Sequence, residues 1–220
     1  MHRATMSRRV AFFVDVGYLR AEGAKRLRIP PAQCRIDAQA TVETLKTVAA
    51  ALWPDASFLR CYWYDGQYPS DHPGHDGQQR FLDAVGEVPG ITLRLGTVKL
   101  VTPPWLTALE GRLGERGLSL ESLGLRTGPI PVQKGVDTLI VLDMVRLAQK
   151  GAYDVAVLVA GDRDLLDAVR TVQDEGRLVV VLHPDGAGLA PELRRAADLV
   201  RALSDDELGV FLRARDALRG

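Results

Sequence analysis

Two short, uninterrupted apolar runs constrain most strongly how this chain can fold. They cover residues 10–14 and 155–159, and both contain only Val, Ala, Leu or Phe. Apolar runs of this length are typical of strands buried on both faces, as at the centre of a parallel sheet. Segments with helical spacing of apolar residues separate the strand-like segments along the chain. This alternation predicts an α/β fold, a three-layer sandwich with a mostly parallel sheet and right-handed crossovers.

The other elements follow from the same periodicities and from capping and breaking residues. Strands are expected over residues 9–16, 57–64, 91–101, 154–160 and 178–182. Helices are expected within 17–28, for about 15 residues after an Asp37 N-cap, and over 78–85, 105–113, 135–149, 163–175, 191–203 and 205–218. Ser204 and Glu207 form a capping box for the last helix. Residues 102–133 are rich in proline and glycine, which argues against a long regular element and favours a lid or binding loop.

Acidic residues lie where two of the predicted strands end. Asp15 directly follows the first apolar run, and Asp162 and Asp164 follow the second within five residues. Asp137 lies at the start of a predicted helix. Ligands bind outside the carboxyl ends of strands in open parallel sheets, and carboxylates gathered there repel one another. The pattern therefore predicts a divalent cation held by oxygen ligands, with a substrate phosphate completing its coordination.

Each of these acids also has an ordinary structural interpretation. Asp15 and Asp162 can cap the helices that follow them, and Asp137 and Asp164 can be first-turn acids favoured by the helix dipole. Asp143 differs because it shares an apolar helix stripe, where a carboxylate is costly unless it is bonded or bound to a metal. The sequence favours neither of two environments for the Asp143 carboxylate, a metal site or a buried hydrogen bond to the backbone. Asp137 and Asp143 lie about 120° apart around a regular helix, so we favour Asp137 for the strand-end site.

The composition is that of an ordinary globular protein. The 220 residues include 28 Lys or Arg and 28 Asp or Glu, and this zero formal net charge argues against a strongly electrostatic nucleic-acid coat protein. Cys34 and Cys61 have no metal-ligand spacing and form no disulfide framework. The basic residues within 1–9 are not followed by an apolar region of signal-peptide kind, and no apolar stretch approaches the ~20 residues of a membrane helix. We therefore expect a cytoplasmic protein that does not associate with membranes.

Residues 94–134 are locally basic in this neutral chain, with six Lys or Arg and three Glu. At the end of this region, Lys134 precedes Gly135 and the predicted start of a helix. A lysine there can bind phosphate as a point charge, and a solvated loop lysine is the alternative.

Four segments, in this order, resemble the motifs of the NYN family, the PIN-like nuclease domains that include the LabA-like bacterial proteins. They are Phe13-Val-Asp-Val-Gly-Tyr-Leu19, Cys61-Tyr-Trp-Tyr-Asp-Gly66, Lys134-Gly-Val-Asp-Thr-Leu-Ile140 with Asp143, and Val157-Leu-Val-Ala-Gly-Asp-Arg-Asp-Leu165. Residues 189–198 also resemble the family's closing helix. We therefore expect an NYN domain over residues 8–203 and a C-terminal helix extension over residues 204–220.

The resemblance implies a PIN-like Rossmannoid sheet and Mg²⁺- or Mn²⁺-dependent cleavage of RNA. Carried over by position, the catalytic and metal-binding cluster would be Asp15, Asp137, Asp162 and Asp164. In the ribonuclease hypothesis, Lys134, Arg163 and the basic region would hold the RNA backbone by charge. Tyr18, Trp105 and Tyr64 would stack on unpaired bases, and core packing is the alternative for each of these aromatic residues. One departure is Tyr18 itself, which stands where many members have an asparagine.

Two other functions are weighed against this ribonuclease. A non-catalytic nucleic-acid or protein adaptor would keep the fold and lack turnover, and Tyr18 and the zero net charge motivate it. A phosphatase of the haloacid-dehalogenase kind needs a second Asp two residues after the first, where this chain has Gly17. The predicted tail helices can pack on the sheet or form a homodimer interface.

Overall fold

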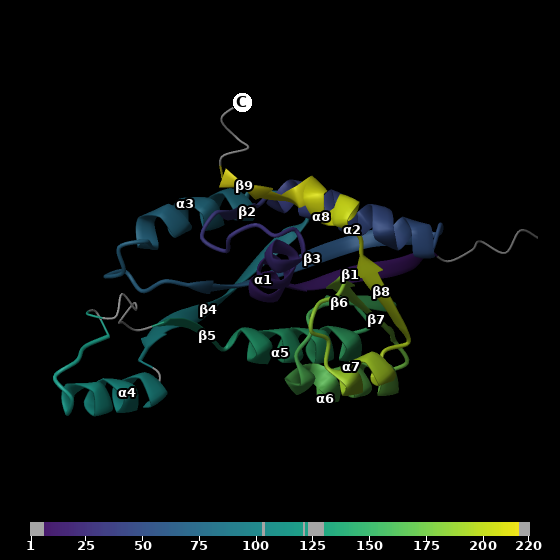
Figure 1. Cartoon of the computed structure of the whole chain (residues 1–220). Helices are drawn as coiled ribbons and strands as arrows, with labels where there is room; N and C mark the ends of the chain where they lie inside the picture. Colours follow the sequence, from purple (N-terminus) through teal and green to yellow (C-terminus); the bar gives the residue numbers. More distant parts are fainter. Residues whose placement is uncertain (1–6, 103, 121, 123–129, 216–220) are drawn as a thin grey trace, which may run out of the picture.

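A seven-stranded sheet forms the centre of the chain (Figure 1). The computed structural model describes residues 7–102, 104–120, 122 and 130–215. The strands lie in the order β5-β4-β3-β1-β6-β7-β8, with bounds Ile130–Lys134, Ile91–Val101, Ala56–Gln67, Arg8–Asp15, Val155–Val159, Leu178–Pro184 and Leu199–Leu203. Neighbouring strands pair in parallel except β4 and β5, which are antiparallel. The predicted α/β fold with a mostly parallel sheet is confirmed.

Helices cover both faces of this sheet and complete the predicted three layers. One face packs against α1 (Val16–Arg26), α2 (Ala38–Leu52), α3 (His75–Gly86) and α8 (Asp205–Phe211), and the other against α5 (Val136–Gln149), α6 (Leu166–Asp174) and α7 (Pro191–Ala196). In Figure 1, α2, α3 and α8 lie above the sheet, and α5, α6 and α7 lie below it. Among the described residues, no helix is both long enough and apolar enough to cross a membrane.

The central strand β1 is apolar along residues 10–14 because both of its faces are buried. Val10, Phe12 and Val14 pack among the helices of one face, and Ala11 and Phe13 pack on the other. Each of these residues is at most 1% exposed. Since burying a Val or Phe side chain contributes roughly 1.5–3 kcal/mol, both faces of β1 stabilise the sandwich.

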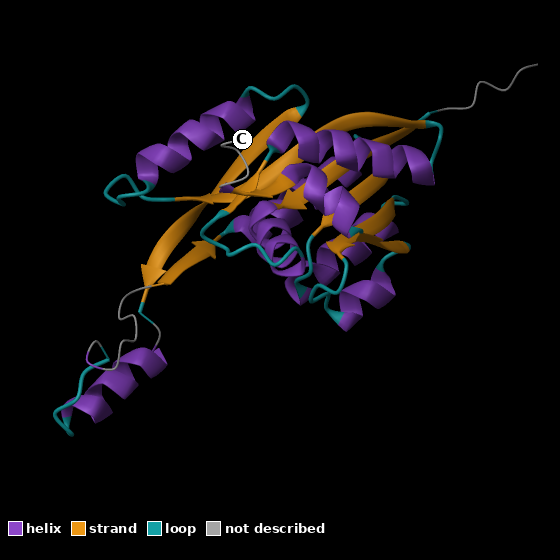
Figure 2. Ribbon diagram, turned by 45° about the horizontal axis from the view of Figure 1, so that its top comes forward, coloured by secondary structure: helices purple, strands orange, loops and turns teal. Residues whose placement is uncertain are grey.

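The sequence does not predict β5, because most of this strand lies within residues 102–133, whose prolines and glycines argue against a long regular element. It follows α4 (Pro104–Gly114), which confirms the short helix expected over 105–113 and projects away from the sheet in Figure 2. Lys134 pairs with Thr97, and Ile130 pairs with Val101. This reversal returns the chain to the level where the parallel strands end, so α5 begins at that edge.

The predicted helix over 191–203 is wrong in its second half. Only α7 is helical, and Leu199–Leu203 forms the edge strand β8 beside β7. The carboxylate of Asp198 accepts a hydrogen bond of 2.7 Å from the backbone N–H of Val179 on β7, which fixes the start of β8. The apolar residues of this segment have helical spacing, but pairing with β7 overrides that local preference.

The predicted tail helix over 205–218 is also too long. It ends at Phe211, and β9 (Leu212–Ala214) pairs with β2 (Cys34–Ile36) in a separate two-stranded sheet. The predicted capping box of Ser204 and Glu207 is confirmed, with both of its hydrogen bonds present. Leu208 and Phe211 are fully buried in the same core as α2, so α8 packs on the sheet layer. Residues 216–220 of the predicted extension lie outside the described residues.

Candidate functional site

The carboxyl ends of the parallel strands form one edge of the sheet, and Asp15 ends β1 there. Its carboxylate accepts a hydrogen bond of 2.9 Å from the N–H of Tyr18, so Asp15 is the N-cap of α1. Burial raises the pKa of Asp15 to about 6 against the opposing Tyr18 N–H bond, and the charges of Asp137 and Asp65 raise it further. Asp15 is therefore both a helix cap and an electrostatically strained carboxylate.

Asp137 lies in the first turn of α5, at the same edge. Gly135, the N-cap, has a φ of 82°, a left-handed conformation that favours glycine and turns the chain from β5 into the helix. Burial raises the pKa of Asp137, and the charges of Asp162 and Asp164 raise it further. The negative charges of the acids that follow β6 therefore act on Asp137, and the charge of Asp137 in turn acts on Asp15.

Asp162 and Asp164 lie in the connection that follows β6. They are exposed, and the carboxylate of Asp162 accepts a hydrogen bond of 3.0 Å from the N–H of Asp164. That bond caps a 3-10 turn, Arg163–Leu165, which precedes α6, so the helix predicted over 163–175 begins as a tighter turn.

The four predicted acids share an edge but do not form a tight cluster. Asp15, Asp137, Asp162 and Asp164 take part in no ion pair with any described residue. Within the same part of the chain, no three His, Cys, Asp or Glu side chains converge closely enough to hold one metal ion. The edge therefore carries uncompensated negative charge whose side chains are spread over three connections.

Asp65, at the end of β3, is an acidic residue of this edge that the sequence reasoning missed. It is only 1% exposed and accepts hydrogen bonds from the N–H of Gly66 at 2.8 Å and from Nε2 of Gln133 at 2.9 Å. Burial raises its pKa, and the charge of Arg20 opposes that shift. Its signal was available, since Asp65 directly follows the aromatic end of a predicted strand as Asp15 follows the apolar run.

The side chain of Gln133 reaches Asp65 by lying over two glycines, Gly17 and Gly66. A Cβ on Gly17 would lie 2.5 Å from Oε1 of Gln133, and one on Gly66 would lie 2.7 Å from its Cγ. These glycines leave the space that the Gln133 side chain occupies. The last residues of β5 therefore cover the ends of β1 and β3.

Tyr18 lines an open groove of about 630 Å³ together with Asp15, Glu22, Gly161, Asp162, Arg163 and residues 188–190. A Cβ on Gly161 would lie 2.5 Å from Cε2 of Tyr18, so the ring packs closely on that glycine. The Tyr18 hydroxyl donates a hydrogen bond of 3.2 Å to the carbonyl of Gly188. Tyr18 thus ties α1 to the loop after β7 and forms a wall of the groove.

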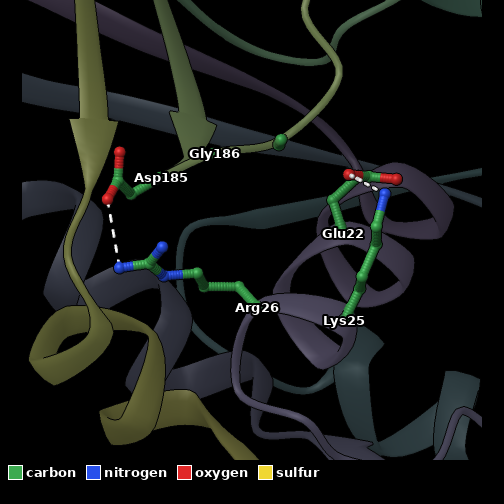
Figure 3. A pocket seen from close by; sticks show the side chains of 6 residues that line it. Glu22, Lys25, Arg26, Asp185 and Gly186 are labelled. Carbon is green, nitrogen blue, oxygen red and sulfur yellow. Dashed lines mark ion pairs between the residues drawn. The ribbon is translucent and has the colours of Figure 1, made fainter.

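A second hollow adjoins this groove on the outer side of α1 (Figure 3). Its charges are paired: Lys25 lies 3.7 Å from Glu22, and Arg26 lies 3.1 Å from Asp185. The Arg26–Asp185 pair ties α1 to the loop that carries Gly186, and the Lys25–Glu22 pair lies within α1; together they leave little uncompensated charge for a ligand.

The predicted substrate residues differ in their surroundings. Lys134 and Arg163 are exposed, and Arg163 has only a distant ion pair with Glu192 at 3.9 Å. Trp105 is 66% exposed on α4. Tyr64 is fully buried and donates its hydroxyl hydrogen bond to Asp143 at 3.2 Å, so the prediction that it stacks on bases is wrong.

Asp143, for which the sequence left a metal site and a hydrogen bond to the backbone open, forms ion pairs with two arginines. Its carboxylate lies 2.8 Å from Nε of Arg94 and 3.3 Å from a guanidinium nitrogen of Arg146. With the Tyr64 hydroxyl as a third donor, neither carboxylate oxygen is left without a partner. We therefore leave Asp143 out of the candidate metal set and assign it to the packing of α5 on β3 and β4.

Comparisons with known proteins agree with this fold. A crystal structure of a protein of unknown function, VPA0982 from Vibrio parahaemolyticus, superposes with a TM-score of 0.56 at 18% identity and covers 96% of this chain and 99% of that one. The uncharacterized protein y4oD of Sinorhizobium fredii is 43% identical over 68 residues, which are 30% of this chain and 32% of that protein. The family model of the NYN domain matches residues 105–204, which include Asp137, Asp162 and Asp164. The predicted resemblance to the NYN domain is confirmed over that range.

Proposed function

We propose that the chain is a metal-dependent ribonuclease that hydrolyses RNA phosphodiester bonds at the strand-end edge. The observation that carries this proposal is that Asp15, Asp137, Asp162 and Asp164 lie at one edge of the sheet and form no ion pair with any described residue. Burial and the neighbouring carboxylates raise the pKa of Asp15 and Asp137, which agrees with this geometry. Such charge is costly unless a ligand compensates it, and perturbed acids in a groove are frequent at functional sites. The NYN domain is PIN-like and related to nucleases, which supports the same reaction class.

The donor chemistry of this edge suits Mg²⁺ or Mn²⁺. Its acids supply only carboxylate oxygens, the ligands that hard divalent cations prefer. Mg²⁺ commonly uses one or two protein carboxylates and completes its shell with waters and substrate phosphate, so a tight group of three acids is not required. When bound, the cation would neutralise phosphate charge and lower the pKa of an attacking water.

In this proposal the chain's own residues have separate roles. Asp15 and Asp137 would hold the cation from β1 and α5, and Asp162 and Asp164 would contribute from the connection after β6. Lys134 and Arg163, both exposed at the rim, would bind RNA phosphates by charge. Tyr18 would border the groove in which the strand lies. We also propose that this activity is cytoplasmic.

The test is cleavage of a labelled RNA pool in Mg²⁺, Mn²⁺ or EDTA by the wild type and by Asp162→Asn. We expect metal-dependent cleavage that falls at least about a hundredfold in the variant, since losing even a residue that only supports a metal ligand typically costs about 10–100-fold. Asp206→Asn is the matched control, because Asp206 is an exposed first-turn acid on α8. Equal cleavage by all three proteins would overturn the assignment of the site.

A non-catalytic binding module is the second candidate. The observation in its favour is that no three acidic or other ligand side chains converge on a common point in the described part of the chain. Under this function, the folded wild type would bind RNA or a protein partner in the assay above and release no product in either metal.

A further inference from the structure

Two adjoining hollows on the α3 side of α1 form a groove that the site described above does not use. One has a volume of about 430 Å³ and the other of about 330 Å³. Both are lined by Arg20, Cys34, Arg35 and Tyr68, so they share a wall. We call this groove, defined by Arg20, Arg35 and Tyr68, the α1–α3 groove.

The arginines of the α1–α3 groove carry positive charge that no ion pair in the described part of the chain neutralises, although the charge of Arg20 also acts on the nearby carboxyl of Asp65. Arg20 and Arg35 form no ion pair with any described residue, and neither hollow has an acidic side chain in its lining. Both guanidinium charges act on the Cys34 thiol between them, where they oppose the rise in its pKa caused by burial. Two unpaired arginines facing one hollow are the arrangement that binds phosphate.

Tyr68 gives the groove an aromatic wall that is held in place. Its ring stacks on His72 with centroids 4.0 Å apart and planes within 7°. Its backbone N–H donates to Oε1 of Gln78 at 2.7 Å, and Nε2 of Gln78 donates to the carbonyl of Gly66 at 2.7 Å. A fixed, half-buried ring beside cationic side chains is a stacking platform for an unpaired base.

The groove is continuous with the acidic edge. Gly17, which follows the Asp15 cap by two residues, lines one hollow and contacts Gln133, the partner of Asp65. Arg20 lies one turn further along α1, and its charge lowers the raised pKa of Asp65. A strand that passes over the N-terminus of α1 at Asp15 would therefore reach the groove beside Gly17.

We infer that the α1–α3 groove binds the nucleotides next to the scissile bond of single-stranded RNA, with Arg20 and Arg35 on phosphates and Tyr68 on a base. The inference rests on the proposed function, because it extends the path of the same substrate. It adds a second binding segment on the opposite side of α1 from the Tyr18 groove. Double-stranded RNA lacks the splayed bases that this arrangement accepts.

The experiment measures binding separately from cleavage. Fluorescence anisotropy in EDTA, with a labelled single-stranded RNA, gives the affinity and its salt dependence for the wild type, Arg20→Gln, Arg35→Gln and Tyr68→Leu. Each arginine variant should bind about three- to tenfold more weakly and reduce the slope of log K against log salt by about one. Tyr68→Leu should bind about tenfold more weakly with an unchanged slope, since it removes stacking and no charge.

The matched control is Arg170→Gln, an exposed arginine on α6 at the other face of the sheet. It should bind like the wild type, and thermal unfolding of the arginine variants should match the wild type, since their side chains make no ion pair with any described residue or only the weak Arg170–Asp167 contact at 3.9 Å. Tyr68→Leu also loses the stack on His72, so its melting temperature should fall slightly while the protein stays folded at the assay temperature. Unchanged affinity and slope in both Arg20→Gln and Arg35→Gln would overturn the inference, as would tighter binding of double-stranded RNA.

This inference and the proposed reaction can fail separately. If the groove variants bind RNA more weakly and the wild type shows no metal-dependent cleavage, the groove is supported as an RNA-binding site and the proposed nuclease activity is rejected. If the wild type cleaves RNA with metal, Asp162→Asn does not, and the groove variants bind RNA like the wild type, the nuclease activity is supported and RNA binding in the groove is rejected. A wild type that binds no single-stranded RNA overturns the groove whatever the cleavage assay gives.

Discussion

The side chain of Gln133 on β5 donates a hydrogen bond of 2.9 Å to the buried carboxylate of Asp65 on β3, although β4 lies between these strands. The contact is possible because Gly17 and Gly66 have no side chain in the space that Gln133 occupies. It joins the antiparallel edge of the sheet to the acids at the strand ends. The position of α5, and with it Asp137, therefore depends on how closely β5 packs on β4.

Gly96→Ala is expected to disturb this packing. A Cβ on Gly96 would lie 2.6 Å from the backbone carbonyl oxygen of Lys134, and backbone cannot move aside as a flexible side chain can. We expect a loss of about 1–3 kcal/mol in the free energy of unfolding, with reduced cleavage because Asp137 shifts. Urea denaturation measures the first effect. Gly209→Ala, whose Cβ would meet nothing within 4 Å, should leave stability unchanged or slightly raised.

Asp15→Asn is expected to stabilise the metal-free protein at neutral pH while it removes activity. Burial raises the pKa of Asp15 to about 6 from an ordinary value of 3.8, so the folded chain binds this proton more tightly than the unfolded chain does. That contribution to stability is complete below pH about 4 and is lost as the pH rises through about 6. Asparagine keeps an oxygen that accepts the Tyr18 N–H bond and carries no charge.

Urea denaturation in EDTA checks this expectation. At pH 7.5 the Asp15→Asn variant should be more stable than the wild type by about 2–3 kcal/mol. Near pH 4 the two proteins should have similar stability. A difference that stays constant between these pH values would show that the carboxylate is not strained in the folded chain.

Asp143→Asn is expected to behave as a packing variant and not as a metal-site variant. The substitution leaves Arg94 and Arg146 without their carboxylate, and Arg94 is about a third exposed, so we expect a moderate cost of about 2 kcal/mol. Its affinity for Mn²⁺, measured by calorimetry on the folded variant, should match that of the wild type. A tenfold loss of Mn²⁺ affinity would instead show that Asp143 is one of the metal ligands.

Mn²⁺ is expected to raise the melting temperature of the wild type. A ligand that binds only the folded state stabilises it by about 2.7 kcal/mol at a hundred times its dissociation constant. Asp137→Asn should show a smaller shift, because it removes a carboxylate whose pKa is raised by burial and by the nearby acids. Asp206→Asn should shift like the wild type. An unshifted wild type would argue against a metal site at this edge.

Local features of the candidate site were predictable because their causes lie within a few residues. The Asp37 N-cap and the Ser204–Glu207 capping box are hydrogen bonds between residues three apart in the chain. The siting of Asp15 after a buried strand follows from its apolar run, and that siting alone suggested a role. The assignment of these acids to a metal remains a prediction.

The sequence by itself determined the layered α/β arrangement, because the short apolar runs 10–14 and 155–159 alternate with segments of helical spacing, and burying both faces of such runs requires helices on each side of the sheet. Only the tertiary structure decided that Leu199–Leu203 forms a strand and that Asp143 pairs with Arg94. It also brought Gln133 to Asp65, 68 residues earlier in the chain. The reason is physical: strand pairing and ion pairing join residues far apart in sequence, and short apolar segments are compatible with helix or strand until a neighbour supplies hydrogen bonds.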